Sequence, residues 1–162
     1  MYTLEDFVKE SNRIEGIHRE PTEEEINVHS RLISLSAVTV EALEHFVSVI
    51  EPGAILRRFG GLNVRVGSHF PMLGGEQVEE ELLWILATGV KGRAGAHKQH
   101  HLYERLHPFT DGNGRSGRAL WLWAMGGRTP LGFLHQFYYQ TLSDKRQCCK
   151  LANEIRNQED RL

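Results

Sequence analysis

The sequence predicts an all-α domain that carries one small β-hairpin. Helix-start signals recur along the chain, the apolar residues between them keep helical spacing, and only one short stretch alternates with a period of two. A chain of 162 residues suits a single domain. A core of this size is stable without a disulfide or a structural metal. Because there is no internal repeat and no linker, we expect one domain over residues 1–162.

Two capping patterns lie near the start of the chain. Thr3 and Asp6 resemble a capping box, and Gly16 lies where the helix that they open would end. Thr22 and Glu25 repeat the pattern directly after a proline. We therefore expect a first helix over about 3–16 and a second helix that opens at Thr22.

Apolar residues at helical spacing predict five later helices. The first of them ends at a Pro-Gly pair, because proline lacks the N–H group that a helix needs and glycine favours turns. The markers of the five helices are Val40–Ile50 before Pro52-Gly53, Val78–Leu86 after Gly74-Gly75, Tyr103 and Leu106 in a helix from near Ala94, Ala119–Trp123 in a helix from near Asn113, and Leu151 with Ile155.

One segment differs from the helical rest. The stretch Leu62–Val66 alternates between apolar and polar residues, and Gly67-Ser68 follows as a tight-turn pair. This pattern predicts a short β-hairpin, which we call the flap (residues 57–71). The flap could be a plain connector. Its glycine-rich start and its alternation favour an exposed edge that docks an extended peptide.

The charge balance argues against a nucleic-acid-binding protein. The chain has 19 Lys and Arg against 21 Asp and Glu, which gives a formal net charge of -2, whereas a nucleic-acid binder carries a basic surplus. The amino terminus lacks the pattern of a signal peptide, and no stretch approaches transmembrane length. Cys148 and Cys149 are adjacent, so they are expected to be reduced thiols. We therefore expect a cytoplasmic protein without a membrane partner.

Residues that could bind a ligand or take part in catalysis are concentrated in residues 107–118, which read HPFTDGNGRSGR. Gly112 and Gly114 let backbone N–H groups approach an anion, and the helix that follows adds the positive end of its dipole. Arg115 and Arg118 are three residues apart, so both can reach the same anion from the first helical turn. This loop therefore predicts a phosphate-binding site.

Two further residues in this motif can be reactive. Asp111 offers a hard oxygen ligand for Mg²⁺, an ion that also bridges phosphate oxygens. His107 can act as a general base near neutral pH. Together with the phosphate site, they describe a centre for phosphoryl or nucleotidyl transfer. The three glycines also fit the G-x-G-x-x-G pattern of dinucleotide-binding folds, but that pattern needs a preceding buried strand, and residues 100–105 are polar and helical.

The motif resembles the signature of the Fic (filamentation induced by cAMP) family, H-x-F-x-[DE]-G-N-G-R-x-x-R. Every defined position matches, from His107 to Arg118. The flap resembles the family's target-docking hairpin, and residues 11–16 (SNRIEG) resemble the family's inhibitory motif, [ST]-x-x-x-E-[GN]. The resemblance covers most of residues 3–142 and implies a Fic-type helical bundle.

The resemblance also implies an activity, which is the transfer of AMP from ATP to a hydroxyl side chain of a target protein with release of pyrophosphate. By analogy, His107 takes the proton of the attacking hydroxyl, and Asp111 holds Mg²⁺ on the α- and β-phosphates. Gly112, Asn113 and Gly114 would form the anion hole for the phosphates.

The family resemblance assigns roles to other residues as well. Arg115 would contact the β-phosphate, Arg118 would hold the γ-phosphate, and Phe109 would be buried beneath the loop. Tyr139 lies where the family lines its adenine pocket. Doc-type members, which transfer the γ-phosphate instead, resemble this motif but carry lysine at the position of Gly114, so glycine there favours nucleotidyl transfer.

The inhibitory motif implies that the enzyme is autoinhibited. Glu15 ends the first helix, and a pair with Arg118 would displace the γ-phosphate, because one guanidinium group cannot hold both groups bidentately. Ser11, one turn earlier, is expected to bond within the anion loop near Asn113. The flap residues expected to dock the target are Val64, Arg65 and Val66.

Several alternatives remain open at this level. With Glu15 aligning a water molecule, the same site could remove AMP from a target. The chain could also be a non-enzymatic nucleotide-binding module of a toxin–antitoxin-like pair. His97, His100 and His101 suggest a zinc site, although no Cys or acidic residue completes the set and a buried, hydrogen-bonding His101 is the simpler interpretation. The target protein, its Ser, Thr or Tyr acceptor and a possible homo-oligomer, which is common among Fic proteins, are not specified by the sequence.

Overall fold

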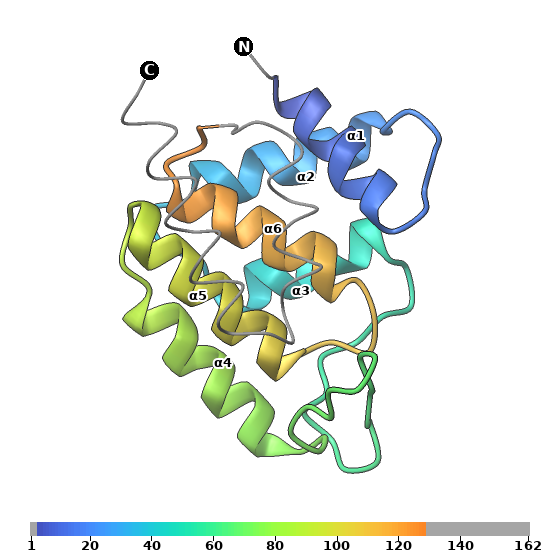
Figure 1. The fold of residues 1–162 in the computed structure, drawn as a ribbon, viewed down its shortest axis with the longest axis vertical. Helices are drawn as coiled ribbons and strands as arrows, with labels where there is room; N and C mark the ends of the chain where they lie inside the picture. Colours follow the sequence, from blue (N-terminus) through green and yellow to red (C-terminus); the bar gives the residue numbers. More distant parts are fainter. Residues whose placement is uncertain (1–2, 129–162) are drawn as a thin grey trace.

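The computed structural model describes residues 3–128, which form six α-helices and no regular β-strand. The all-α prediction is confirmed (Figure 1). The expected helix around Leu151, the two cysteines and Tyr139 lie outside the described residues. The helices are α1 (Leu4–Ile14), α2 (Glu23–Ser34), α3 (Val40–Ile50), α4 (Glu76–Thr88), α5 (Arg93–Leu106) and α6 (Asn113–Ala124).

Threonine side chains begin the first three helices. In α1 and α2 both capping boxes form as predicted, with Thr3 and Asp6 exchanging hydrogen bonds in one and Thr22 and Glu25 in the other. Thr39 caps α3 by accepting a hydrogen bond from the backbone three residues later. These local bonds satisfy N–H groups that have no partner within a helix, so they fix where each helix starts.

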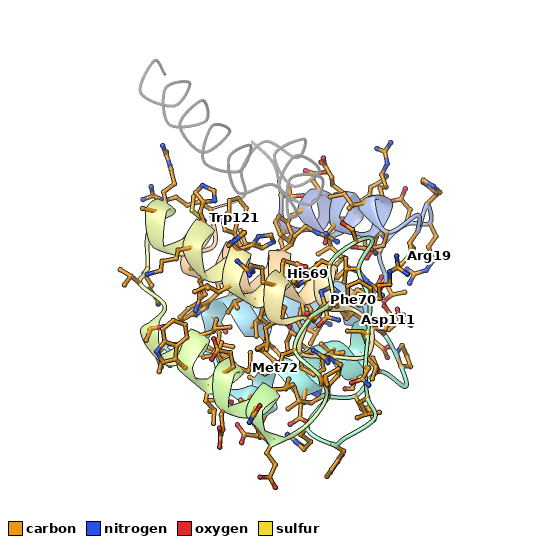
Figure 2. The ribbon with its side chains drawn as sticks, turned by 60° about the horizontal axis from the view of Figure 1, so that its bottom comes forward. Arg19, His69, Phe70, Met72, Asp111 and Trp121 are labelled. Carbon is orange, nitrogen blue, oxygen red and sulfur yellow. The ribbon has the colours of Figure 1, made fainter. Side chains whose placement is uncertain are left out.

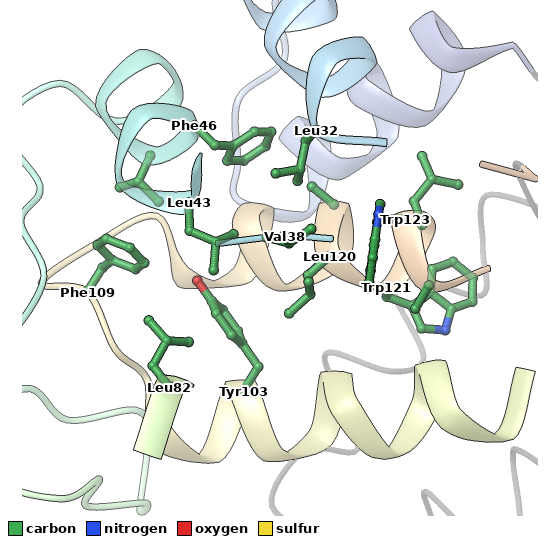
Figure 3. Packing of buried hydrophobic residues seen from close by; sticks show 14 of the residues in the cluster. Leu32, Val38, Leu43, Phe46, Leu82, Tyr103, Phe109, Leu120, Trp121 and Trp123 are labelled. Carbon is green, nitrogen blue, oxygen red and sulfur yellow. The ribbon is translucent and has the colours of Figure 1, made fainter. Parts of the chain in front are cut away.

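Helix α6 is the centre of the bundle. It contacts α5 on one side and α1, α2 and α3 on the others (Figure 1). Every residue from Asn113 to Ala124 is buried. Figure 3 shows the core around it, where Phe46 of α3, Tyr103 of α5 and Leu120 of α6 meet. A helix that is buried on all sides must satisfy its polar side chains inside the protein.

The flap is not the β-hairpin that the sequence predicts. A single antiparallel bridge joins Val66 to His69 around the expected Gly67-Ser68 turn, with N–O distances of 3.0 and 2.8 Å. Residues 62–66 do alternate between half-buried and exposed positions. No partner strand lies within hydrogen-bonding reach in the described part of the chain, so the alternation produces an extended loop rather than a ladder.

A buried arginine ties this loop to the end of α5. Arg57 is fully buried, and its guanidinium group donates to four carbonyl oxygens. Two lie at the end of α5, His107 O (2.7 Å) and Leu106 O (2.7 Å), and two lie on the flap side, Met72 O (2.8 Å) and Leu62 O (3.2 Å). One side chain therefore holds the flap against the start of the 107–118 motif.

The residue held by Arg57 has an unusual backbone. His107 is the residue among 3–128, glycine aside, that has a positive φ, with φ 51° and ψ 62°. This left-handed conformation ends α5 and costs free energy for a residue with a side chain. The bond from Arg57 Nε to the carbonyl oxygen of His107 stabilises it.

The described helices can be compared with the length and composition of a membrane-spanning helix. Within residues 3–128, no helix combines the length and the apolar composition that crossing a bilayer requires.

Replacing Arg57 with methionine should destabilise the fold strongly. Four carbonyl groups would lose their donor, and the buried cavity would hold no charge to replace it, so we expect a loss of about 3 kcal/mol or more in the free energy of unfolding, measured by urea denaturation. The matched control is Arg58→Met. Arg58 is partly exposed and pairs with Glu44 and Glu79 at 3.0 Å, so its loss should cost about 1 kcal/mol or less. Equal losses in the two variants would contradict the role given to Arg57.

Candidate active site

His107 and residues 111–115 of the motif line one cavity of about 480 Å³, whereas Arg118 is buried and is not among the lining residues. Four segments line it: the motif itself, the end of α1 with Glu15 and Ile17, residue Glu51 just after α3, and the flap tip at 65–67. The structure thus brings together the motif, the flap and the first helix. Glu51 and Ile17 are lining residues that the sequence analysis missed, because no local pattern marks them.

The motif loop is shaped by glycine and asparagine. Gly112 has φ +74°, and a Cβ atom there would lie 3.2 Å from Cβ of Glu51, so a larger residue would fit poorly. The Asn113 side chain accepts from the Phe109 N–H and donates to the Phe109 carbonyl, both at 2.8 Å. Phe109 is buried, as predicted. These bonds close the loop from beneath.

The N-terminus of α6 faces the cavity. The first intrahelical bond there runs from Ser116 N to Gly112 O (3.0 Å), so the preceding N–H groups have no partner within the helix. Such groups, with the helix dipole, bind anions. The side chain of Asn113 is engaged with Phe109, so Asn113 can contribute to an anion hole only through its backbone.

His107 lines the cavity, and a backbone carbonyl holds one of its ring nitrogens. Its Nδ1 lies 3.1 Å from the carbonyl oxygen of Glu104. A carbonyl only accepts, so Nδ1 carries the proton of the neutral ring and Nε2 is left as the acceptor. Burial lowers the pKa of His107, and the nearby Arg57 adds to this effect. The imidazole is therefore neutral near pH 7, which is the form that can accept a proton.

Arg118 is buried and held by α1. Its Nε donates to Ser11 Oγ (2.9 Å), and its Nη2 donates to Ser11 O (3.0 Å) and to Glu15 Oε1 (2.7 Å). The pair of Glu15 and Arg118 is the contact that the inhibitory motif implies. The expected place of Ser11 is wrong: it bonds to Arg118 rather than near Asn113, because Arg118 reaches the buried face of α1 that carries Ser11.

The carboxylate of Glu15 also closes in on the anion loop. A Cβ atom on Gly114 would lie 2.3 Å from Glu15 Oε1, so glycine at this position lets α1 approach the start of α6. Glu15 thereby occupies space beside the backbone where a phosphate would bind.

Arg115 lines the cavity with its guanidinium group already bound to the end of α3. Its Nη1 donates to Ile50 O (2.6 Å), and its Nη2 forms an ion pair with Glu51. The side chain is buried against the end of α3, although it still lines the cavity. A β-phosphate at this position would have to share the guanidinium group with Glu51.

The carboxylate of Asp111 is suited to bind Mg²⁺. Three carboxylates line the cavity, and Glu15 and Glu51 each pair with an arginine. Asp111 is exposed and forms no ion pair with a described residue; its Oδ1 accepts from Gly112 N at 2.7 Å. Mg²⁺ at nucleotide sites takes one or two carboxylates and completes its shell with phosphate oxygens and water. A single carboxylate such as that of Asp111 fits this pattern.

The zinc alternative has no ligand set in the described part of the chain. Among residues 3–128, no group of three His, Cys, Asp or Glu side chains could hold a metal ion. His97 stacks on Trp121 with ring centroids 5.9 Å apart. His101 is half-buried rather than buried, and it does not join the other histidines in a common site.

The flap tip borders the cavity. Arg65 and Val66 line it, whereas Val64 is not among the lining residues. His69 Nε2 lies 2.8 Å from the carbonyl oxygen of Arg105, which ties the tip to the last turn of α5. Figure 2 shows His69 and Phe70 on the same side of the molecule as Asp111. A segment bound along the tip would therefore lie next to the motif.

The comparisons with known proteins are consistent with this arrangement. A sequence model of the Fic/DOC family matches residues 17–125, which include the flap and the complete motif and leave α1 outside. A comparison with curated proteins finds no match. Because the match covers more than half of the chain, the protein belongs to the Fic/DOC family.

Proposed function

We propose that this protein is a protein adenylyltransferase, which transfers AMP from ATP to a hydroxyl side chain of a target protein. The observation that carries the proposal is that a neutral His107, the N-terminus of α6 and Asp111, which forms no ion pair within residues 3–128, line one cavity beside the flap tip. Glycine at position 114 adds support, because the Doc-type motif, which serves γ-phosphate transfer, has lysine there.

The reaction follows from the positions of these groups. The target hydroxyl attacks the α-phosphorus of ATP while His107 Nε2 takes its proton. The bond between the α-phosphorus and the bridging oxygen breaks, and pyrophosphate leaves. The N–H groups at the start of α6 bind the phosphates and stabilise the charge that develops on them. Asp111 would hold Mg²⁺, which neutralises phosphate charge when it is bound.

Helix α1 restrains this activity. Arg118 is the cation buried at the first turns of α6 that a γ-phosphate would need, and it is held by Glu15 and Ser11. The Glu15 carboxylate beside Gly114 also repels a phosphate at the same place. ATP can then bind only with its γ-phosphate displaced, and the α-phosphate is misaligned for attack. Loss of attack geometry of this kind costs about 100-fold in rate.

Removal of AMP from a modified target is the second candidate. The Glu15 side chain is 27% exposed and lines the cavity while Oε1 is held by Arg118. A carboxylate in this position can orient a water molecule toward the phosphorus of bound AMP. Release of AMP from an AMP-modified target protein by the parent, and its loss on Glu15→Gly, would favour this activity over transfer.

Replacing His107 with alanine should abolish transfer and keep ATP binding. The base acts on the hydroxyl, whereas the phosphates are bound by the backbone from residue 112 onward, so the rate should fall by about 10²–10⁴. The assay measures transfer of label from α-labelled ATP to proteins of a cell extract, and calorimetry measures the Kd for ATP. A variant that labels proteins at the parent rate would show that His107 is not the base.

Replacing Glu15 with glycine should raise transfer by about 100-fold, because Arg118 becomes available to the γ-phosphate. The double variant Glu15→Gly with Arg118→Ala should be inactive again, since the released arginine is missing. The matched control is Glu20→Gly, which removes an exposed glutamate that pairs with Lys9 outside the cavity. The control should stay within about twofold of the parent. If Glu15→Gly is no more active than the control, restraint by α1 is ruled out.

A further inference from the structure

The buried carboxyl group of Glu104 lies next to His107, the proposed base. Glu104 is in the last turn of α5 and is 3% exposed. Neither of its carboxyl oxygens forms a hydrogen bond with a residue that the structure describes. Burying an ionisable group in this way is costly, and a buried acid beside a catalytic group is a common sign of a functional role.

The position of Glu104 relates it to the motif. Its Oε2 lies 3.9 Å from His107 Nδ1, and its Oε1 lies 3.6 Å from His100 Nε2. A Cβ atom on Gly117 would lie 2.3 Å from Oε1. The glycine between the two arginines of the motif therefore makes room on α6 for this carboxyl group.

The charges around Glu104 come from three helices. Arg118 on α6 favours its ionised form, Glu15 on α1 opposes it, and His100 and His107 lie on its own helix. Burial is the largest effect and raises the pKa of Glu104 to about 8. The groups that face His107 are Glu104 of α5, Arg57 and His69 of the flap region, and Glu15 of α1.

We propose that Glu104 is a positioning residue for His107, whose carboxylate stabilises the imidazolium ion that forms during transfer. The proposal rests on the proposed function, in which His107 Nε2 accepts the proton of the attacking hydroxyl. The proton stays on His107, and no bond to Glu104 forms or breaks. The backbone carbonyl of Glu104 holds Nδ1 at 3.1 Å, and its carboxylate lies on the same side of the ring.

The arrangement has a consequence for pH dependence. As the pH rises through the raised pKa of Glu104, the carboxylate forms and strengthens His107 as a base. The transfer rate should therefore increase with pH as Glu104 ionises. In the Glu15→Gly variant, the increase should come at a lower pH than the pKa of Glu104 in the parent, because Glu15 is one of the groups that raise that pKa.

Glu104→Gln tests the proposal, because glutamine keeps the size and removes the charge. In the Glu15→Gly background, we expect the increase in rate with pH to disappear, with about a 10-fold loss at alkaline pH, while the Kd for ATP stays within about twofold. The matched control is Tyr103→Phe, which changes the neighbour of Glu104 on α5 and removes a buried hydroxyl bonded to Ser116 of α6. The control should keep the pH dependence.

A second measurement separates this proposal from the proposed function. NMR titration of His107 needs no enzymatic activity. In the parent, the ring signals of His107 should shift as Glu104 ionises through its pKa of about 8, and Glu104→Gln should remove this alkaline shift. If Glu104→Gln removes the shift but no variant transfers AMP, the contact between Glu104 and His107 is supported and only the proposed function is contradicted. An unchanged titration would overturn the proposal. If Glu104→Gln does not fold, Gly117→Ala, which pushes the carboxyl group away, should also remove the alkaline shift, and a shift that persists would be equally contradictory.

Discussion

The structure depends on the burial of polar side chains along the central helix. Every residue of α6 is buried, and the helix carries Asn113, Arg115, Ser116 and Arg118 in its first two turns. A buried charged group that loses its partner costs several kcal/mol, about 3–5 by comparison with broken buried ion pairs. Each element packed on α6 therefore has to supply a polar partner as well as apolar surface, and this requirement fixes where the surrounding helices lie.

The partners of α6 are also the walls of the cavity. The end of α1 is brought to the anion loop because Arg118 needs Ser11 and Glu15, and the end of α3 is brought there because Arg115 needs Ile50 O and Glu51. The regulation that we propose for α1 is thus a consequence of satisfying a buried arginine. In the proposed regulation, a phosphate of the ligand can replace α1 as the partner of Arg118. Helix α1 can therefore inhibit transfer while it is bound to Arg118 and be displaced without leaving the arginine unpaired.

Features that depend on neighbouring residues are predictable from the sequence, whereas contacts between distant residues are not. The capping boxes at Thr3 and Thr22 and the turn at Gly67-Ser68 depend on a few neighbouring residues, so they could be read directly. The flap ladder was predicted from alternation alone and is absent, because a strand needs a partner that the pattern does not provide. Arg57 and Glu104 have partners that only the fold brings to them, so their place behind His107 had no local sign.

The central claim is that Glu15 and the γ-phosphate of ATP compete for Arg118. Crystal structures with ATP and Mg²⁺ test it most directly, with Glu15→Gly and the parent both carrying His107→Ala to prevent turnover. The account predicts phosphates at the N–H groups of residues 113–115 in both, with the γ-phosphate on Arg118 only when Glu15 is replaced. A γ-phosphate on Arg118 in the protein that retains Glu15, or a nucleotide bound outside this cavity, would contradict it.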